Sequence, residues 1–263
     1  MPDNFLIALL LTIIAGLSTG IGSLIGLLSK SDNKNFLSVS LGFSAGVMIY
    51  VSMIEIFPKA KASLSIELGH KMATIATTLA FFAGILIIAL IDKLIPSEMN
   101  PHEIYVSKKN VDRKKLMKMG LMTATALGIH NFPEGLATFV SALDDPGLAL
   151  PIVVAIAIHN IPEGLAVSVP IYQATGSRKK AFKYSFLSGL AEPAGALIGW
   201  FILMPFMSTT LYGLIFASVA GIMVFISLDE LLPAAHEFGE HHLSIYGLIS
   251  GMALMAISLL LFL

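Results

Sequence analysis

The stretch His-Asn-Phe-Pro-Glu-Gly at residues 130–135 returns almost unchanged as His-Asn-Ile-Pro-Glu-Gly at residues 159–164. Each copy stands inside a long apolar segment, which is typical of a helix that crosses a membrane. An ionisable group near the centre of a bilayer costs roughly 2.5–3.5 kcal/mol on insertion scales. Two copies of an imidazole, an amide and a carboxylate at that depth therefore predict a functional site inside a helical membrane protein.

The composition of the whole chain agrees with a membrane protein. Of its 263 residues, 56% are hydrophobic and 13% are charged, whereas soluble domains carry about 25% charged residues. The chain has no cysteine, which excludes disulfides, thiolate metal ligands and cysteine nucleophiles. The stretch from Met1 to Leu28 lacks a basic start and a small-residue cleavage site, so we expect a retained first helix and not a signal peptide. The expected surroundings are a lipid bilayer, with no nucleic-acid partner.

Hydropathy predicts eight transmembrane helices. They cover approximately residues 5–28, 36–57, 71–95, 116–141, 149–172, 181–204, 211–232 and 243–263. The predicted fold is thus an all-α integral membrane protein with a single transmembrane domain over residues 1–263. Residues 96–115 form the longest polar stretch, which we expect to be a cytoplasmic loop between the third and fourth spans.

Positive charges predict how these spans are oriented. If the N-terminus lies outside, all of the 16 Lys and Arg residues except Lys59, Lys61 and Lys71 fall on the cytoplasmic side. Cytoplasmic loops carry an excess of Lys and Arg, so this orientation is strongly favoured. We expect a multi-pass protein of the cell inner (plasma) membrane with both termini outside the cytoplasm.

The two ends of the chain resemble each other. Residues 46–60 align without gaps on residues 221–235, with matching Gly, Met, Ser, Glu, Pro and Ala, and Gly16 aligns with Gly189 at a similar offset. In the predicted orientation the matched spans run in opposite directions. The expected arrangement is 3+2+3, with spans 1–3 inverted relative to spans 6–8 and spans 4 and 5 in the centre. Inverted repeats of this kind are typical of secondary transporters, although Gly-rich apolar segments can also align by chance.

The repeated motif offers ligands for a metal ion. His130 and Glu134 stand one helical turn apart and share one face, and Asn131 adds an amide oxygen beside them. Pro133 has no N–H, so it leaves the Ile129 carbonyl without a helical partner. The second copy supplies the same groups from His159, Asn160 and Glu163. Mixed nitrogen and oxygen ligation suits Zn²⁺ and Fe²⁺, with Mn²⁺ and Co²⁺ as alternatives, better than Ca²⁺ or Mg²⁺.

Further polar residues extend this candidate site. Glu192 and Glu55 are intramembrane carboxylates, which we expect to act as ligands or relays, although each could be a hydrogen-bonded residue at a helix interface. Asp229, Glu230 and His236 stand near the inner end of span 7 and are candidates for a cytoplasmic exit or gate. His102 and the group formed by Glu237, Glu240, His241 and His242 could capture metal, but a solvated loop explains them as well.

The doubled motif on adjacent central spans resembles the ZIP (Zrt/Irt-like) metal transporters. The stretches at residues 52–58 and 227–233 resemble bacterial members of that family, and the likeness covers essentially the whole chain. It implies import of divalent metal into the cytoplasm by alternating access. Zinc is the first expected substrate, with iron, manganese, cobalt or cadmium as further cargo and no prosthetic group.

The resemblance also implies a metal centre between spans 4, 5 and 6. One metal would use His130, Glu134, His159 and Glu163. A second would use Asn131, Asn160, Glu163 and Glu192, with Glu134 bridging.

Two other functions remain open from the residues alone. An intramembrane metalloenzyme would use the same His and Glu ligands with one open position for water. However, the His-Glu-x-x-His helix of zinc proteases is absent, so an enzyme is not the expected function. A metal exporter or sensor could share the site, and the sequence also leaves a homodimer open.

Overall fold

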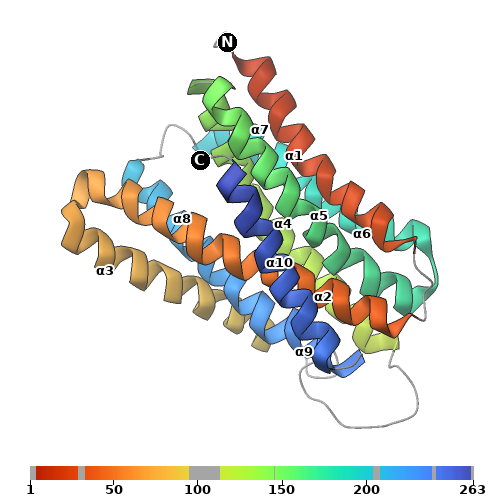
Figure 1. The fold of residues 1–263 in the computed structure, drawn as a ribbon. Helices are drawn as coiled ribbons and strands as arrows, with labels where there is room; N and C mark the ends of the chain where they lie inside the picture. Colours follow the sequence, from red (N-terminus) through yellow and green to blue (C-terminus); the bar gives the residue numbers. More distant parts are fainter. Residues whose placement is uncertain are drawn as a thin grey trace.

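The computed structural model describes residues 4–28, 33–94, 113–144, 146–203, 208–238 and 241–261, and most of these residues are helical with no strand among them. Figure 1 shows the helices packed as one bundle, with α3 and α8 side by side at the left and α1, α5 and α6 at the right. The elements are α1 (Phe5–Gly26), α2 (Lys34–Val51), η1 (Ser52–Ile56), α3 (Phe57–Leu94), α4 (Arg113–Asp144), α5 (Pro146–Thr175), α6 (Arg178–Gly189), α7 (Ala191–Ile198), η3 (Gly199–Leu203), α8 (Thr209–Ile226), η5 (Ser227–Leu231), α9 (Leu232–Phe238) and α10 (His241–Leu261).

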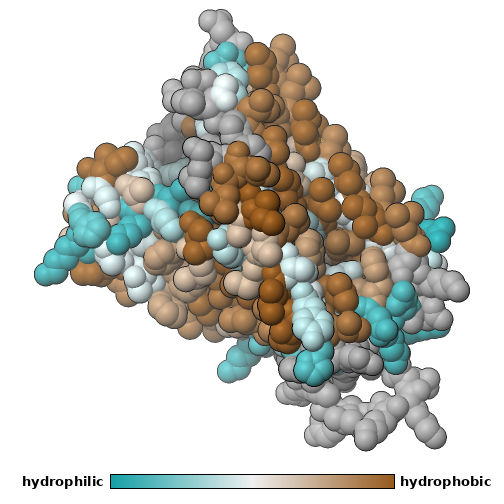
Figure 2. Space-filling view, in the orientation of Figure 1, coloured by the Kyte–Doolittle hydropathy of each residue, from teal (hydrophilic) through white to brown (hydrophobic). Residues whose placement is uncertain are grey.

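Within the described residues, five helical stretches are long and apolar enough to cross a membrane. They are Phe5–Gly26, Lys34–Leu90, Arg178–Ile202, Thr209–His236 and His242–Leu261. Helix α1 also turns a ridge of large apolar side chains outward, including Leu10, Ile14, Leu17 and Ile21, and this edge of the molecule is hydrophobic in Figure 2. A continuous exposed apolar surface of this kind is unfavourable in water and expected in lipid.

The second helical arm is longer than hydropathy predicts. We expected a span at residues 36–57 and a connection up to residue 70, but the chain stays helical through α2, η1 and the first part of α3. It reverses at Gly69, whose φ of 71° lies in the left-handed region. No glycine or proline interrupts the sequence between Pro58 and Gly69, so nothing in that segment breaks the helix earlier.

Two π-helical turns stand at matching places in the aligned ends of the chain. Both η1 (Ser52–Ile56) and η5 (Ser227–Leu231) begin at a serine, and the two serines are equivalent positions of the alignment. The Ser52 hydroxyl donates to Met48 O at 2.6 Å, and the Ser227 hydroxyl donates to Met223 O at 2.8 Å. Because π-helical turns are rare, two of them in register show that the aligned sequences adopt the same local structure.

The helices that follow these turns make matching contacts. Helix α10 packs on α2, while α3 packs on α8. A Cβ built on Gly46 would lie 2.0 Å from Leu248 O, and a Cβ built on Gly221 would lie 2.0 Å from Phe81 O. Equivalent glycines thus bring each of these helix pairs into backbone contact, which only a residue without a side chain allows.

Helices α1 and α7 pack in the same matched way on the two motif helices. A Cβ on Gly22 of α1 would lie 1.8 Å from Ile161 O of α5, and a Cβ on Gly195 of α7 would lie 1.9 Å from Phe132 O of α4. Gly22 and Gly195 are equivalent positions of the two aligned ends, and Phe132 and Ile161 are equivalent positions of the two motif copies. These contacts fix the depth at which each motif copy sits against its neighbouring helix.

The sixth helical segment, Arg178–Ile202, agrees with the span predicted at residues 181–204, and it is interrupted at one residue. Helix α6 ends at Gly189, Leu190 forms a turn, and α7 begins at Ala191. Pro193 has no N–H to donate to the Gly189 carbonyl, so the regular ladder cannot continue there. The break places Glu192 in the first turn of α7.

Candidate metal centre

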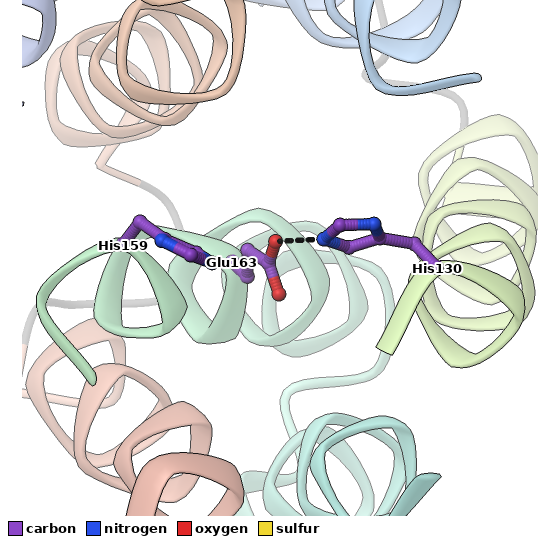
Figure 3. A group of neighbouring side chains, drawn as sticks. All are labelled: His130, His159 and Glu163. Atoms are coloured by element: carbon purple, nitrogen blue, oxygen red, sulfur yellow. Dashed lines mark ion pairs between the residues drawn. The ribbon is translucent and has the colours of Figure 1, made fainter. Parts of the chain in front are cut away.

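The two motif copies meet in the interior of the bundle. His130 and Glu134 lie on α4, and His159 and Glu163 lie on α5, which packs against α4. All four side chains are buried. Figure 3 shows Glu163 reaching from α5 toward the imidazole of His130 on α4. Both helices continue across the motif prolines, Pro133 and Pro162.

Each histidine pairs with the glutamate of the other copy. His130 Nε2 lies 3.4 Å from Glu163 Oε1, and His159 Nε2 lies 3.0 Å from Glu134 Oε1. Within the first copy, His130 Nε2 lies 3.3 Å from Glu134 Oε2, as expected for residues one turn apart. The four side chains thus form one crosswise cluster, and neither copy holds its ligands separately.

The spacing of these atoms suits a transition-metal ion. Zinc binds histidine nitrogen and carboxylate oxygen at about 2.0–2.2 Å in tetrahedral geometry, which places its ligand atoms about 3.4 Å apart. The three pairs above span 3.0–3.4 Å. One ligand atom from each of His130, His159 and Glu163 lies within 4.8 Å of the others. These three residues could therefore hold one ion, and Glu134 contacts both histidines beside them.

The two asparagines are held by neighbouring helices. Asn131 Nδ2 donates to Ser188 O on α6 at 3.2 Å, and Asn160 Nδ2 donates to Ala15 O on α1 at 3.0 Å. Asn160 Nδ2 also donates to Glu192 Oε1. Because the amide nitrogen of each asparagine is engaged, its side-chain oxygen remains as the group that could bind a metal ion.

Many polar atoms of the cluster have no hydrogen-bond partner, although they are buried. They are both ring nitrogens of His130 and of His159, Oδ1 of Asn131 and of Asn160, Oε2 of Glu134 and of Glu192, and both carboxylate oxygens of Glu163. An unsatisfied buried polar group costs about 1–3 kcal/mol, and more when it is charged. A cation would satisfy most of these atoms at once, because nearly all of them are acceptors.

Glu192 lies beside this cluster, as the sequence indicates. It is fully buried in the first turn of α7 and joined to α5 through Asn160. Glu134, Glu163 and Glu192 thus bring three carboxylates together in the interior. The role of each residue as a metal ligand stays a prediction.

Glu55 has a different setting. Its Oε1 accepts from Lys59 Nζ at 2.7 Å, one turn further along the helix. A role of Glu55 as a metal ligand or relay stays a prediction. Lys59 stands four positions after Glu55 in the sequence, but we used it only to predict the orientation and not as a partner of Glu55.

The candidate gate residues lie on η5 and α9. Glu230 is buried and accepts from the Thr123 hydroxyl of α4 at 3.3 Å, so it joins the end of α8 to a motif helix. Asp229 lies next to it on η5, and His236 Nδ1 lies 3.1 Å from the Ser244 hydroxyl of α10. A gate at these residues remains a prediction. His102 lies outside the described residues, and so do the side chains of Glu237, Glu240 and His241.

Sequence reasoning missed the backbone groups that hold the site. Ala15 O and Ser188 O orient the two amides, and they are carbonyls that no side-chain pattern identifies. The one available signal was the alignment of the two ends, since Ala15 and Ser188 stand immediately before the matched Gly16 and Gly189.

The fold is a bundle of helices, several of them long and apolar enough to cross a membrane, and its interior holds a buried cluster of histidines and carboxylates. A family model described as ZIP Zinc transporter matches residues 95–259. The chain belongs to this ZIP family.

Several relatives match the chain over its whole length. A protein of Streptococcus mutans named Zinc transporter ZupT is 70% identical over 263 residues, which is 100% of both chains. A protein of the same name from Chlorobium chlorochromatii is 66% identical, and the match covers 100% of both chains. Another of that name, from Oceanobacillus iheyensis, is 63% identical, and the match covers 98% of this chain and 99% of the relative.

Proposed function

We propose that this protein imports zinc into the cytoplasm through the buried centre on α4, α5 and α7. The observation that carries the proposal is the crosswise cluster of His130, Glu134, His159 and Glu163, whose buried side chains contact one another at 3.0–3.4 Å. The full-length relatives named zinc transporters support zinc as the substrate. Iron, manganese, cobalt and cadmium are further candidates, because nitrogen and oxygen ligands suit them too.

The proposed membrane arrangement has eight spans in a 3+2+3 order within a single domain. The inverted repeat is supported by the matched π-helical turns and by the matched glycine contacts of α1 with α5 and of α7 with α4. We place residues 96–115 in the cytoplasm and both termini outside it, in the inner membrane. Homodimer formation stays an open proposal.

The chemistry of the centre fits a carrier that releases its substrate. Imidazole, amide and carboxylate ligands bind zinc without thiolate, so the ion is held less firmly than in cysteine-rich structural sites. One ion would use His130, Glu134, His159 and Glu163, and a second would use the two asparagines with Glu163 and Glu192. Alternating access then exposes the centre to each side in turn, as in other transporters with inverted repeats.

Zinc uptake into proteoliposomes tests this proposal. We expect zinc to enter vesicles that contain the purified protein and a trapped fluorescent chelator, and not to enter protein-free vesicles. The same assay, with each metal at equal free concentration, ranks iron, manganese, cobalt and cadmium. Zinc binding without influx would contradict transport and favour a sensor or an enzyme, and a preference for efflux in oriented vesicles would favour an exporter.

The orientation can be tested with single cysteines, because the chain has none of its own. Lys71 and Lys179 are both exposed, and they are predicted to lie on opposite sides of the membrane. A membrane-impermeant maleimide added to intact cells should label Lys71→Cys and leave Lys179→Cys unlabelled until the cells are opened. The reverse pattern would place both termini in the cytoplasm.

A further inference from the structure

Thr19 of α1 occupies the position that is equivalent to Glu192 of α7. The same offset in the sequence relates Thr19 to Glu192 and Gly16 to Gly189. A Cβ on Gly164 would lie 2.0 Å from Thr19 O, and a Cβ on Gly135 would lie 2.1 Å from Glu192 O. Gly135 and Gly164 are the last residues of the two motif copies. Thr19 therefore stands against α5 as Glu192 stands against α4.

The local symmetry axis passes close to both side chains. A Cβ on Gly16 would lie 2.6 Å from Gly189 O, and a Cβ on Gly189 would lie 2.5 Å from Gly16 O. A Cβ on Gly189 would also lie 2.9 Å from Thr19 Cβ, and a Cβ on Gly16 would lie 3.4 Å from Glu192 Cβ. The threonine and the glutamate thus flank one contact between α1 and α6, next to the helices that carry the centre.

The Thr19 hydroxyl is buried and has no hydrogen-bond partner among the residues that the structure describes. A threonine inside a helix usually donates to the carbonyl four positions earlier, which here is Ala15 O. That carbonyl already accepts from the Ser18 hydroxyl at 2.5 Å and from Asn160 Nδ2 at 3.0 Å. The acceptor that Thr19 would otherwise use is therefore already engaged by Ser18 and by the amide of the motif.

Other buried hydroxyls of this region provide a comparison. Thr12, also on α1, donates normally to Ala8 O at 3.0 Å. The hydroxyls of Ser23 and Ser168 lack partners as Thr19 does, but the repeat places alanine and phenylalanine at their equivalents, Ala196 and Phe139. Of these three unpartnered hydroxyls, only that of Thr19 is matched by a residue that touches the centre.

We propose that the Thr19 hydroxyl is a neutral contact for zinc, or for a water bound to zinc, on the α1 side of the centre. This inference rests on the proposed function, and it names a residue that helps to set the affinity of the centre for zinc. Across the axis, Asn131 Oδ1 is also buried without a partner, which supports an open oxygen site there. A hydroxyl at this place adds a ligand without adding negative charge to that of Glu134, Glu163 and Glu192. It therefore holds the ion less firmly than a fourth carboxylate would, and the ion can be released.

Three variants test the role of Thr19. Thr19→Val keeps the shape and removes the hydroxyl, Thr19→Ser keeps the hydroxyl, and Thr12→Val is the matched control on the same helix. We expect Thr19→Val to raise the zinc KM for uptake and the zinc Kd of the purified protein by about tenfold. Thr19→Ser should stay within about threefold of the wild type, and Thr12→Val should not differ from it.

The outcomes separate this inference from the proposed function. If wild-type protein fails to move zinc into vesicles, the proposed function is wrong, while the zinc Kd still reports on Thr19. If wild-type protein transports zinc and Thr19→Val matches Thr12→Val in both KM and Kd, the role of Thr19 is wrong. An equal loss in Thr19→Ser would assign the effect to packing and would also overturn it. Thr19→Ala repeats the test if the valine variant does not fold.

Discussion

Glu163→Gln is expected to lower zinc uptake at least about a hundredfold, because removal of an outer-shell partner alone typically costs metal sites 10–100-fold. Glu163 is fully buried, and both of its carboxylate oxygens lack a hydrogen-bond partner. The glutamine keeps the size of the side chain and removes its charge. The zinc Kd of the purified variant should rise by a similar factor, since the same carboxylate would bind the ion.

The matched control for this prediction is Glu67→Gln. Glu67 is an exposed residue of α3 that accepts from the Thr210 hydroxyl, so the same substitution there leaves the centre untouched. We expect its uptake to equal that of the wild type. Uptake by Glu163→Gln within twofold of the wild type would show that the ion does not pass the crosswise cluster.

Gly22→Ala is expected to have the largest effect on stability. The new Cβ would lie 1.8 Å from Ile161 O, a backbone atom that can move only if α1 and α5 separate. Overpacking typically costs about 1–3 kcal/mol, and an obstructed backbone puts this variant at the upper end. At about 2–4 °C per kcal/mol for a protein of this size, the melting midpoint in detergent should fall by about 10 °C.

Two further variants check the interpretation of Gly22→Ala. Gly195→Ala should have a similar effect, because its Cβ would lie 1.9 Å from Phe132 O at the equivalent contact. Gly128→Ala is the control, since a Cβ there meets no atom within 4 Å and alanine favours the helix. Equal melting midpoints for all three variants would mean that close helix contacts do not limit stability.

Much of the centre could be predicted from the sequence, because its side chains follow simple spacing. His130 and Glu134 share a helix face one turn apart, and the second copy of the motif supplies His159 and Glu163. The structure brings these four together. What they bind was inferred from the chemistry of the side chains and from the resemblance to ZIP transporters, and the variants above test their role as ligands.

Other features could not be predicted, because they depend on packing between distant segments. The Thr19 hydroxyl makes no hydrogen bond within the described residues, and the Ala15 carbonyl that it would normally use accepts from Ser18 and, across the helix interface, from Asn160. The continuation of the second arm to Gly69 was hidden by its polar residues, which we took for a loop. Hydropathy detects long apolar stretches, so it does not detect a polar helix. It also does not show an interruption inside an apolar stretch, such as the one between α6 and α7 at Leu190.

The reciprocal contact between Gly16 and Gly189 also limits how the two halves of the chain can evolve. Each glycine faces the backbone of the other, so neither half can gain a side chain there without pushing its counterpart away. One turn further along, the halves differ in chemistry, with a hydroxyl at Thr19 and a carboxylate at Glu192. The two aligned ends therefore keep glycine where their backbones meet and differ in charge one turn away, where only the second end places a carboxylate beside Asn160.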